Sequence, residues 1–176
     1  MLNRHEVPLL NLADRDFLGE DAWRRNFTLL RTYGLSFDLS INPGQMAQAA
    51  SFLGGHPDTP TAVCHLGFPI ERYDSGIELW RSGMAALAER PNVFVKMSGM
   101  GMFDRYWTAD SIKRIVLETI EMFGTGRVMF GSNFPVDRPM SSAEQLRDAL
   151  LQVTETLSDS ERDNLFFRTA STFYRI

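Results

Sequence analysis

Residues 92–132, NVFVKMSGMGMFDRYWTADSIKRIVLETIEMFGTGRVMFGS, contain the pattern that decides the fold. Two short apolar runs in this stretch, Asn92–Met97 and Arg127–Ser132, have the length of strands. Between them, Thr108 can cap a helix that continues through Phe123. Apolar side chains recur there at helical spacing, at Ile112, Ile115, Val116, Ile120 and Phe123. A strand, a helix and a second strand in this order predict a βαβ unit with parallel strands.

The same alternation of strands and helices extends toward the N-terminus. Asn42 can cap one of these helices, because Pro43 is then at its first position, where proline is favoured. The elements expected here are the strands Leu35–Ile41 and Thr61–Leu66 and the helices Asp21–Tyr33, Pro43–Leu53 and Gly76–Glu89.

Helices follow the last strand. The capping boxes Ser141-x-x-Glu144 and Ser158-x-x-Glu161 mark two helix starts. The helices expected from them are Ser142–Leu157 and Asp159–Phe167, and Ala170–Ile176 is expected to pack as a last helical turn.

These elements make four βα units, and Leu2–Leu12 is expected to hold the remnant of a fifth strand and its loop. A closed (β/α)₈ barrel takes about 250 residues and eight strands. The 176 residues are too few for that. We therefore expect an α/β fold in a single domain over residues 1–176, either a partial (β/α)₈ barrel or a small open sheet with parallel strands.

Composition excludes several classes of partner. The net charge is −4 and no basic block occurs, so nothing favours binding to nucleic acid or to an anionic membrane surface. No apolar run reaches the roughly 18–20 residues that span a bilayer, and the first residues do not resemble a signal peptide. Cys64 is the single cysteine, so no internal disulfide can form and a reducing, cytoplasmic setting is expected.

Each expected strand ends on a polar side chain. In parallel α/β folds the chemistry lies at these carboxyl ends, so the pattern predicts a polar site on one rim of the sheet. The side chains are Asp38 on the first strand, His65 on the second, Lys96 on the third, and Asn133, Asp137 and Arg138 after the fourth.

His65 is the candidate with the clearest chemistry, because imidazole can transfer protons, donate a hydrogen bond or ligate a metal. The alternative is a core histidine that bonds to a backbone carbonyl. Its neighbour Cys64 points to the opposite strand face and is expected to be packing. His56 precedes a strand, at the end of the sheet away from the predicted site, and is expected in a surface loop.

Lys96 is unusual in the middle of an apolar strand, because burying its charge without a partner is costly. It could hold an anionic group of a substrate, or form a structural ion pair with Asp38. Asp38 likewise could contact substrate or serve only in that ion pair. His5 could end a broken first strand and contact substrate. Several loop residues could also contact substrate or simply be solvated, namely Glu71, Arg72, Asp74, Asp104, Arg105 and Arg138. Arg138 is the best placed of them and would suit a carboxylated substrate.

Three motifs in this order, residues 65–67 (HLG), 95–99 (VKMSG) and 129–137 (MFGSNFPVD), resemble the second half of the amidohydrolase-related family. That family includes lactonases acting on sugar lactones and on pyrone dicarboxylate, and decarboxylases of the aminocarboxymuconate type. The resemblance implies the C-terminal portion of a (β/α)₈ barrel and hydrolysis at a carbonyl, such as the opening of a lactone. In the family, the histidine at the position of His65 binds metal or substrate, and position 133 is commonly an aspartate that activates water.

The sequence departs from the family at two points. The His-x-His pair of the family's first strand does not occur here, and position 133 is asparagine. An amide cannot accept a proton as a general base does, but Asn133 could orient a water or a carbonyl, and Asp137 could supply the base. A catalytic zinc needs about three protein ligands. His65 is the one suitable candidate, so no cofactor is certain, although a divalent metal such as zinc fits the family.

Three functions remain open from sequence. The first is a hydrolase for a small cyclic ester or related carbonyl compound, using His65, Asn133 and Asp137. The second is a half-barrel without catalytic activity that self-associates as a homo-oligomer, because open sheet edges favour pairing. The third is a doubly wound domain of the receiver or flavodoxin type. It is disfavoured, because neither an acidic cluster nor a phosphate loop follows the first strand.

Overall fold

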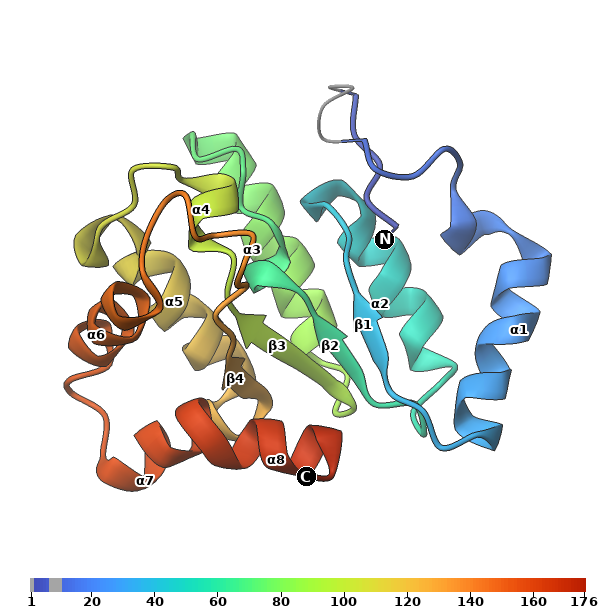
Figure 1. The fold of residues 1–176 in the computed structure, drawn as a ribbon. Helices are drawn as coiled ribbons and strands as arrows, with labels where there is room; N and C mark the ends of the chain where they lie inside the picture. The colour runs from blue at the N-terminus through green and yellow to red at the C-terminus, as the bar shows by residue number, and fades with distance from the viewer. Residues whose placement is uncertain (1, 7–10) are drawn as a thin grey trace.

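The sheet has four parallel strands in the order β1-β2-β3-β4. A computed structural model describes residues 2–6 and 11–176 (Figure 1). The strands are β1 (Phe37–Leu39), β2 (Thr61–Val63), β3 (Val93–Met97) and β4 (Val128–Phe130). Each pairs in parallel with the next, so the predicted α/β class with four βα units is confirmed.

Apart from α4, which the sequence did not predict, the helices fall where the sequence places them, with bounds shifted by a few residues. They are α1 (Asp21–Thr32), α2 (Met46–Gly54), α3 (Asp74–Ala88), α4 (Met100–Phe103), α5 (Ala109–Phe123), α6 (Ala143–Val153), α7 (Asp159–Asp163) and α8 (Thr169–Tyr174). Single 3₁₀ turns are Phe17–Gly19, Pro43–Gln45, His65–Gly67 and Thr125–Arg127, and a π-helical segment, Asn164–Arg168, joins α7 to α8.

The helix caps confirm three expectations and correct one. Asn42, Thr108 and Ser158 each begin a helical segment as predicted. The expected box at Ser141 is displaced by one residue. Ser142 accepts from the backbone N–H of Gln145, whose side chain accepts from the N–H of Ser142. Glutamine closes such a box as well as glutamate does, and this explains the shift.

One face of the sheet carries the main core. The side chains of Leu39, Val63, Val95 and Met97 alternate along the strands and are at most 1% exposed. They pack on the helices behind the sheet in Figure 1, where Trp80 of α3 is fully buried. Alternation with period two is what orients these side chains toward the helices.

The opposite face is only partly covered. Ala62 and Met129 pack there against Phe173 of α8, which lies below the strands in Figure 1. Asp38 and Lys96 belong to the same face, and their side chains keep 51% and 21% of their surface exposed. This face is therefore where polar groups meet solvent.

The expected fifth strand at Leu2–Leu12 is not assigned as a strand in its described residues, and residues 7–10 lie outside the described part. Leu2 nevertheless donates a backbone hydrogen bond of 2.8 Å to Ser40, just beyond β1. Asn3 accepts from the hydroxyl of Ser40 at 2.7 Å, so this segment is tied to the end of the sheet. No helix within the described ranges is long and apolar enough to cross a membrane.

Candidate active site

A left-handed turn presents His65 at the end of β2. His65, Leu66 and Phe68 have φ angles of 54°, 52° and 53°. A residue with a side chain in this region costs about 1–3 kcal/mol and persists only when its surroundings hold it there. Here the indole N–H of Trp80 donates to the carbonyl of Leu66 at 2.7 Å. The strained turn is thus fixed from the core side.

The imidazole of His65 fits between two neighbouring strands. Its Nδ1 lies 2.9 Å from the hydroxyl of Ser98, at the end of β3, and its ring meets Phe68 edge-on at 5.1 Å. Gly99 has φ +71°, and a Cβ there would lie 2.6 Å from Nδ1. Glycine is therefore required at this position for His65 to keep its place.

Burial, with a smaller contribution from the charge of Lys96, lowers the pKa of His65 to about 4, and Asp38 opposes this shift weakly. The ring is accordingly neutral at pH 7, a poor proton acceptor and a good hydrogen-bond donor. Burial also raises the pKa of Cys64 to about 11, so this residue is a thiol rather than a thiolate nucleophile.

The lowered pKa of His65 predicts that the free energy of unfolding falls as pH drops from about 6.5 toward 4. Between these values the unfolded chain holds a proton on this imidazole and the folded chain does not, so acid favours unfolding. The loss is expected to reach about 3 kcal/mol, since one pKa unit corresponds to about 1.4 kcal/mol. Urea denaturation of wild type and His65→Asn at several pH values measures it. Equal pH dependence in both would contradict the prediction.

Lys96 and Asp38 form the ion pair that the sequence left as one of two alternatives. Lys96 Nζ lies 2.5 Å from Asp38 Oδ2, and the hydroxyl of Tyr174 donates to Asp38 Oδ1 at 3.3 Å. Burial lowers the pKa of Lys96, but the hydrogen bonds with Asp38 and Tyr174 outweigh it and the net pKa is raised. A contact of Lys96 or Asp38 with substrate stays a prediction.

Asn133 and Asp137 form a second cluster, after β4. Asn133 has a φ of 55°, and its Nδ2 donates to Asp137 Oδ1 at 3.0 Å. The backbone N–H of Gly101 donates to Asp137 Oδ2 at 3.4 Å. Asp137 is 1% exposed, and burial raises its pKa. Both carboxylate oxygens of Asp137 are thus engaged below the surface, where the residue holds Asn133 in place. Its expected role as the base stays a prediction.

The predicted residues therefore gather at the same rim only in part. His65 and Ser98 follow the adjacent strands β2 and β3, and Lys96 lies within β3. Gly131 after β4 sits against Ser98, with 3.2 Å from a Cβ there to the Ser98 Cβ. Arg138 is exposed at the surface beyond this group. His56 lies in the loop before β2, at the other end of the sheet, as expected, but its ring is half-buried and packs edge-on against Phe27 and tilted against Phe52.

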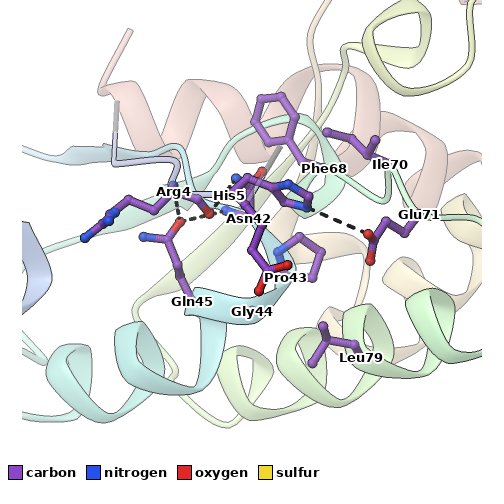
Figure 2. A pocket seen from close by; sticks show the side chains of 11 residues that line it. Arg4, His5, Asn42, Pro43, Gly44, Gln45, Phe68, Ile70, Glu71 and Leu79 are labelled. Atoms are coloured by element: carbon purple, nitrogen blue, oxygen red, sulfur yellow. Dashed lines mark hydrogen bonds and ion pairs between the residues drawn. The ribbon is translucent and has the colours of Figure 1, made fainter. Parts of the chain in front are cut away.

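A cavity of about 400 Å³ lies at the same end of the sheet, beyond β1 and β2 (Figure 2). His5 and Glu71 line it, and His5 Nε2 is 3.8 Å from Glu71 Oε1. Phe68 lines the cavity and its ring also meets that of His65, so the Phe68 side chain stands between the cavity and the imidazole. Sequence reasoning gave Glu71 no defined role, because 66 residues separate it from His5.

The side chains in the described ranges do not assemble a metal centre by themselves. No three His, Cys, Asp or Glu side chains gather there in a metal-binding arrangement. Nδ1 of His65 is taken up by Ser98, and both oxygens of Asp137 accept hydrogen bonds. A catalytic zinc needs about three protein ligands, so these residues do not fit one.

The comparison with known families agrees with this architecture. The family described as Amidohydrolase matches residues 6–176. The chain belongs to the amidohydrolase family. This confirms the resemblance drawn from residues 65–67, 95–99 and 129–137.

Two curated relatives of this amidohydrolase chain show how much of a longer protein it matches. It is 41% identical over 154 residues to the uncharacterized protein y4mH of Sinorhizobium fredii, and the alignment covers 88% of this chain and 52% of that protein. It is 26% identical over 185 aligned positions to an L-fucono-1,5-lactonase of Burkholderia multivorans, covering 98% of this chain and 62% of that enzyme. The chain therefore spans about half to three-fifths of the length of these relatives.

Solved structures of an amidohydrolase from Burkholderia multivorans have the same fold. One, with bound HEPES, matches with a TM-score of 0.84 at 25% identity, over 91% of this chain and 60% of that chain. Another, with bound Zn, also matches with a TM-score of 0.84, at 24% identity, over 91% of this chain and 59% of that chain. The four strands here correspond to part of the barrel, as the sequence predicted.

Proposed function

We propose that the full protein is a hydrolase that opens a small cyclic ester, with His65 as the group that polarises the carbonyl. The observation that carries this is a neutral imidazole, with a pKa of about 4, held by Ser98 and Gly99 at the carboxyl end of a parallel sheet. Family membership and the relative named L-fucono-1,5-lactonase support a lactone as the substrate. The cytoplasmic setting and the single domain over residues 1–176 remain predictions.

In this reaction water adds to the lactone carbonyl carbon, the ring C–O bond breaks, and a hydroxy acid forms. With the Ser98 hydroxyl donating to Nδ1, the proton of His65 resides on Nε2, and this N–H can donate a hydrogen bond to the carbonyl oxygen as negative charge develops there. An imidazole with a low pKa stays neutral, so it can donate a hydrogen bond without carrying a charge into a buried site. No step is routed through a metal ion.

Asn133 is proposed to orient the substrate or the attacking water, and Asp137 to position Asn133. The hydrogen bond to Asp137 fixes the amide so that Nδ2 faces the loop. The amide oxygen is then left as the acceptor that can face the rim. An asparagine at position 133 is thereby compatible with a role in the site without acting as a base.

Substitutions of Asp137 can show whether this residue positions Asn133 or acts as the general base. We expect Asp137→Ala to lower kcat/KM for a sugar lactone by about tenfold and to destabilise the fold by about 1–3 kcal/mol, because a buried N–H at Gly101 and the Asn133 amide lose their acceptor. Asp137→Asn keeps one acceptor oxygen, which can still serve the Asn133 amide at the expense of the Gly101 N–H, so it should retain more activity than Asp137→Ala. Acid release followed at constant pH measures turnover. Equal losses in the two variants would identify Asp137 as the base instead.

The alternative proposal is a half-barrel that self-associates. The open edges of the four-stranded sheet favour it, because an edge strand can pair with a strand of a second copy. Sedimentation equilibrium distinguishes the proposals, since the mass of a single chain in solution would contradict self-association.

A further inference from the structure

The cavity in Figure 2 is built by three segments that are far apart in sequence. Residues 4–6, the turn after β1 and the loop after β2 line it, and Leu79 of α3 closes one side. Its volume of about 400 Å³ is in the range of small-molecule sites.

The floor of the cavity is rigid, because its side-chain amides already form hydrogen bonds with the backbone. Gln45 Oε1 accepts from the N–H groups of Arg4 and Asn42 at 2.8 and 3.2 Å, and Gln45 Nε2 donates to the carbonyl of Leu2 at 2.8 Å. Asn42 Nδ2 donates to the carbonyl of Arg4 at 3.0 Å. A ligand would therefore meet a preorganised wall, and its polar groups would form hydrogen bonds with other side chains.

Those side chains are His5 and Glu71. In Figure 2 the His5 ring points across the cavity toward the Glu71 carboxylate. Their side chains keep 20% and 40% of their surface exposed, so both can be reached. A carboxylate accepts hydrogen bonds from two neighbouring hydroxyl groups, and such charge-assisted bonds are the strong ones.

The cavity also has apolar walls, and Glu6 adds a second carboxylate to that of Glu71 in its lining. Pro43, Ile70 and Leu79 line the cavity beside the His5–Glu71 pair. Arg4 also lines it, but it is exposed and in Figure 2 its side chain extends away from that pair. A ligand with carboxylates at this end would meet the like charge of Glu71, which is unfavourable in a partly desolvated site.

We propose that this cavity binds the ring of a neutral, polyhydroxylated ligand, a sugar or its lactone, with Glu71 accepting from its hydroxyls and Ile70 and Pro43 packing on its C–H face. The inference rests on the proposed function, in which such a lactone reacts beside His65. It makes Glu71 the residue that favours a neutral sugar ring over a dicarboxylate.

The test is binding, measured apart from turnover. L-fucose and 2-pyrone-4,6-dicarboxylate are titrated into the 176-residue chain and followed by ligand-observed NMR. Glu71→Ala is expected to weaken L-fucose binding about tenfold, and Glu71→Gln, which keeps the size and loses the charge, to tighten dicarboxylate binding several-fold. Glu121→Gln, the same exchange on the exposed side of α5, should change neither. Circular dichroism confirms that each variant folds.

The outcomes separate this inference from the proposed function. L-fucose binding that depends on Glu71, without hydrolysis of a sugar lactone by the full protein, would support the cavity assignment and overturn the hydrolase. Lactone hydrolysis with unchanged kcat/KM and L-fucose affinity in Glu71→Ala would support the hydrolase and overturn the cavity assignment. Tighter binding of the dicarboxylate than of L-fucose by the wild-type chain would also overturn it.

Discussion

Replacing His65 with asparagine is expected to lower kcat/KM for a sugar lactone about a hundredfold in the full protein, in the range seen when a single oxyanion donor or acid–base group is removed. The asparagine amide can take the place of Nδ1 and keep a contact with Ser98. Nothing then reaches the position of Nε2, so the developing oxyanion loses its donor. Initial rates of acid release against lactone concentration measure the effect.

Glutamine at position 65 is the matched control. Its amide reaches the position of Nε2 and can donate there, so His65→Gln should recover part of the activity that His65→Asn loses. Because the ring of His65 is neutral at pH 7, the kcat/KM of the wild type is expected to stay level through pH 6.5 and to decline only nearer pH 4. Equal kcat/KM in wild type and His65→Asn would remove His65 from the mechanism.

The fold was largely predictable because each strand is a short apolar run that can be recognised from its local sequence. Val93–Met97 is apolar, has strand length, and is separated from β4 by a helix with a clear apolar stripe. Two helical features were not predicted, because they depend on tertiary contacts. The helix α4 is a single turn of four residues, too short to show a period, and the π-helical segment Asn164–Arg168 gives no signal that differs from an α-helix.

The site was predictable in its residue types but less so in their roles. Lys96 in an apolar strand required a partner, and Asp38 was the nearest candidate on the same face, so their ion pair was foreseen as an alternative. The burial of Asp137 was not, because it is set by the backbone of Gly101, 36 residues earlier. The Tyr174 hydroxyl at Asp38 lies 136 residues away in sequence, beyond the reach of any local pattern.

Trp80 is expected to link the stability of the fold to the site. Trp80→Phe should lower the free energy of unfolding by about 1–3 kcal/mol, because the carbonyl of Leu66 is left buried without its donor. Trp80→Ala should cost about 3–5 kcal/mol, since it also leaves a cavity beside Met84. Urea denaturation at pH 7 measures both. Trp23→Phe is the control, since Trp23 is half-buried against Phe27 and Phe37 and the exchange preserves ring packing.

The same substitution should act on His65 through the turn that carries it. Without the Trp80 hydrogen bond, the left-handed residues Leu66 and Phe68 lose the contact that compensates their strain, and the turn is free to relax. Water then reaches the imidazole, so the pKa of His65 should rise from about 4 toward its ordinary value of 6.5. An NMR titration of the imidazole in Trp80→Phe detects this change, which a purely local packing defect in α3 would not produce. An unchanged His65 pKa, together with a stability loss no larger than that of Trp23→Phe, would show that the core does not hold the turn.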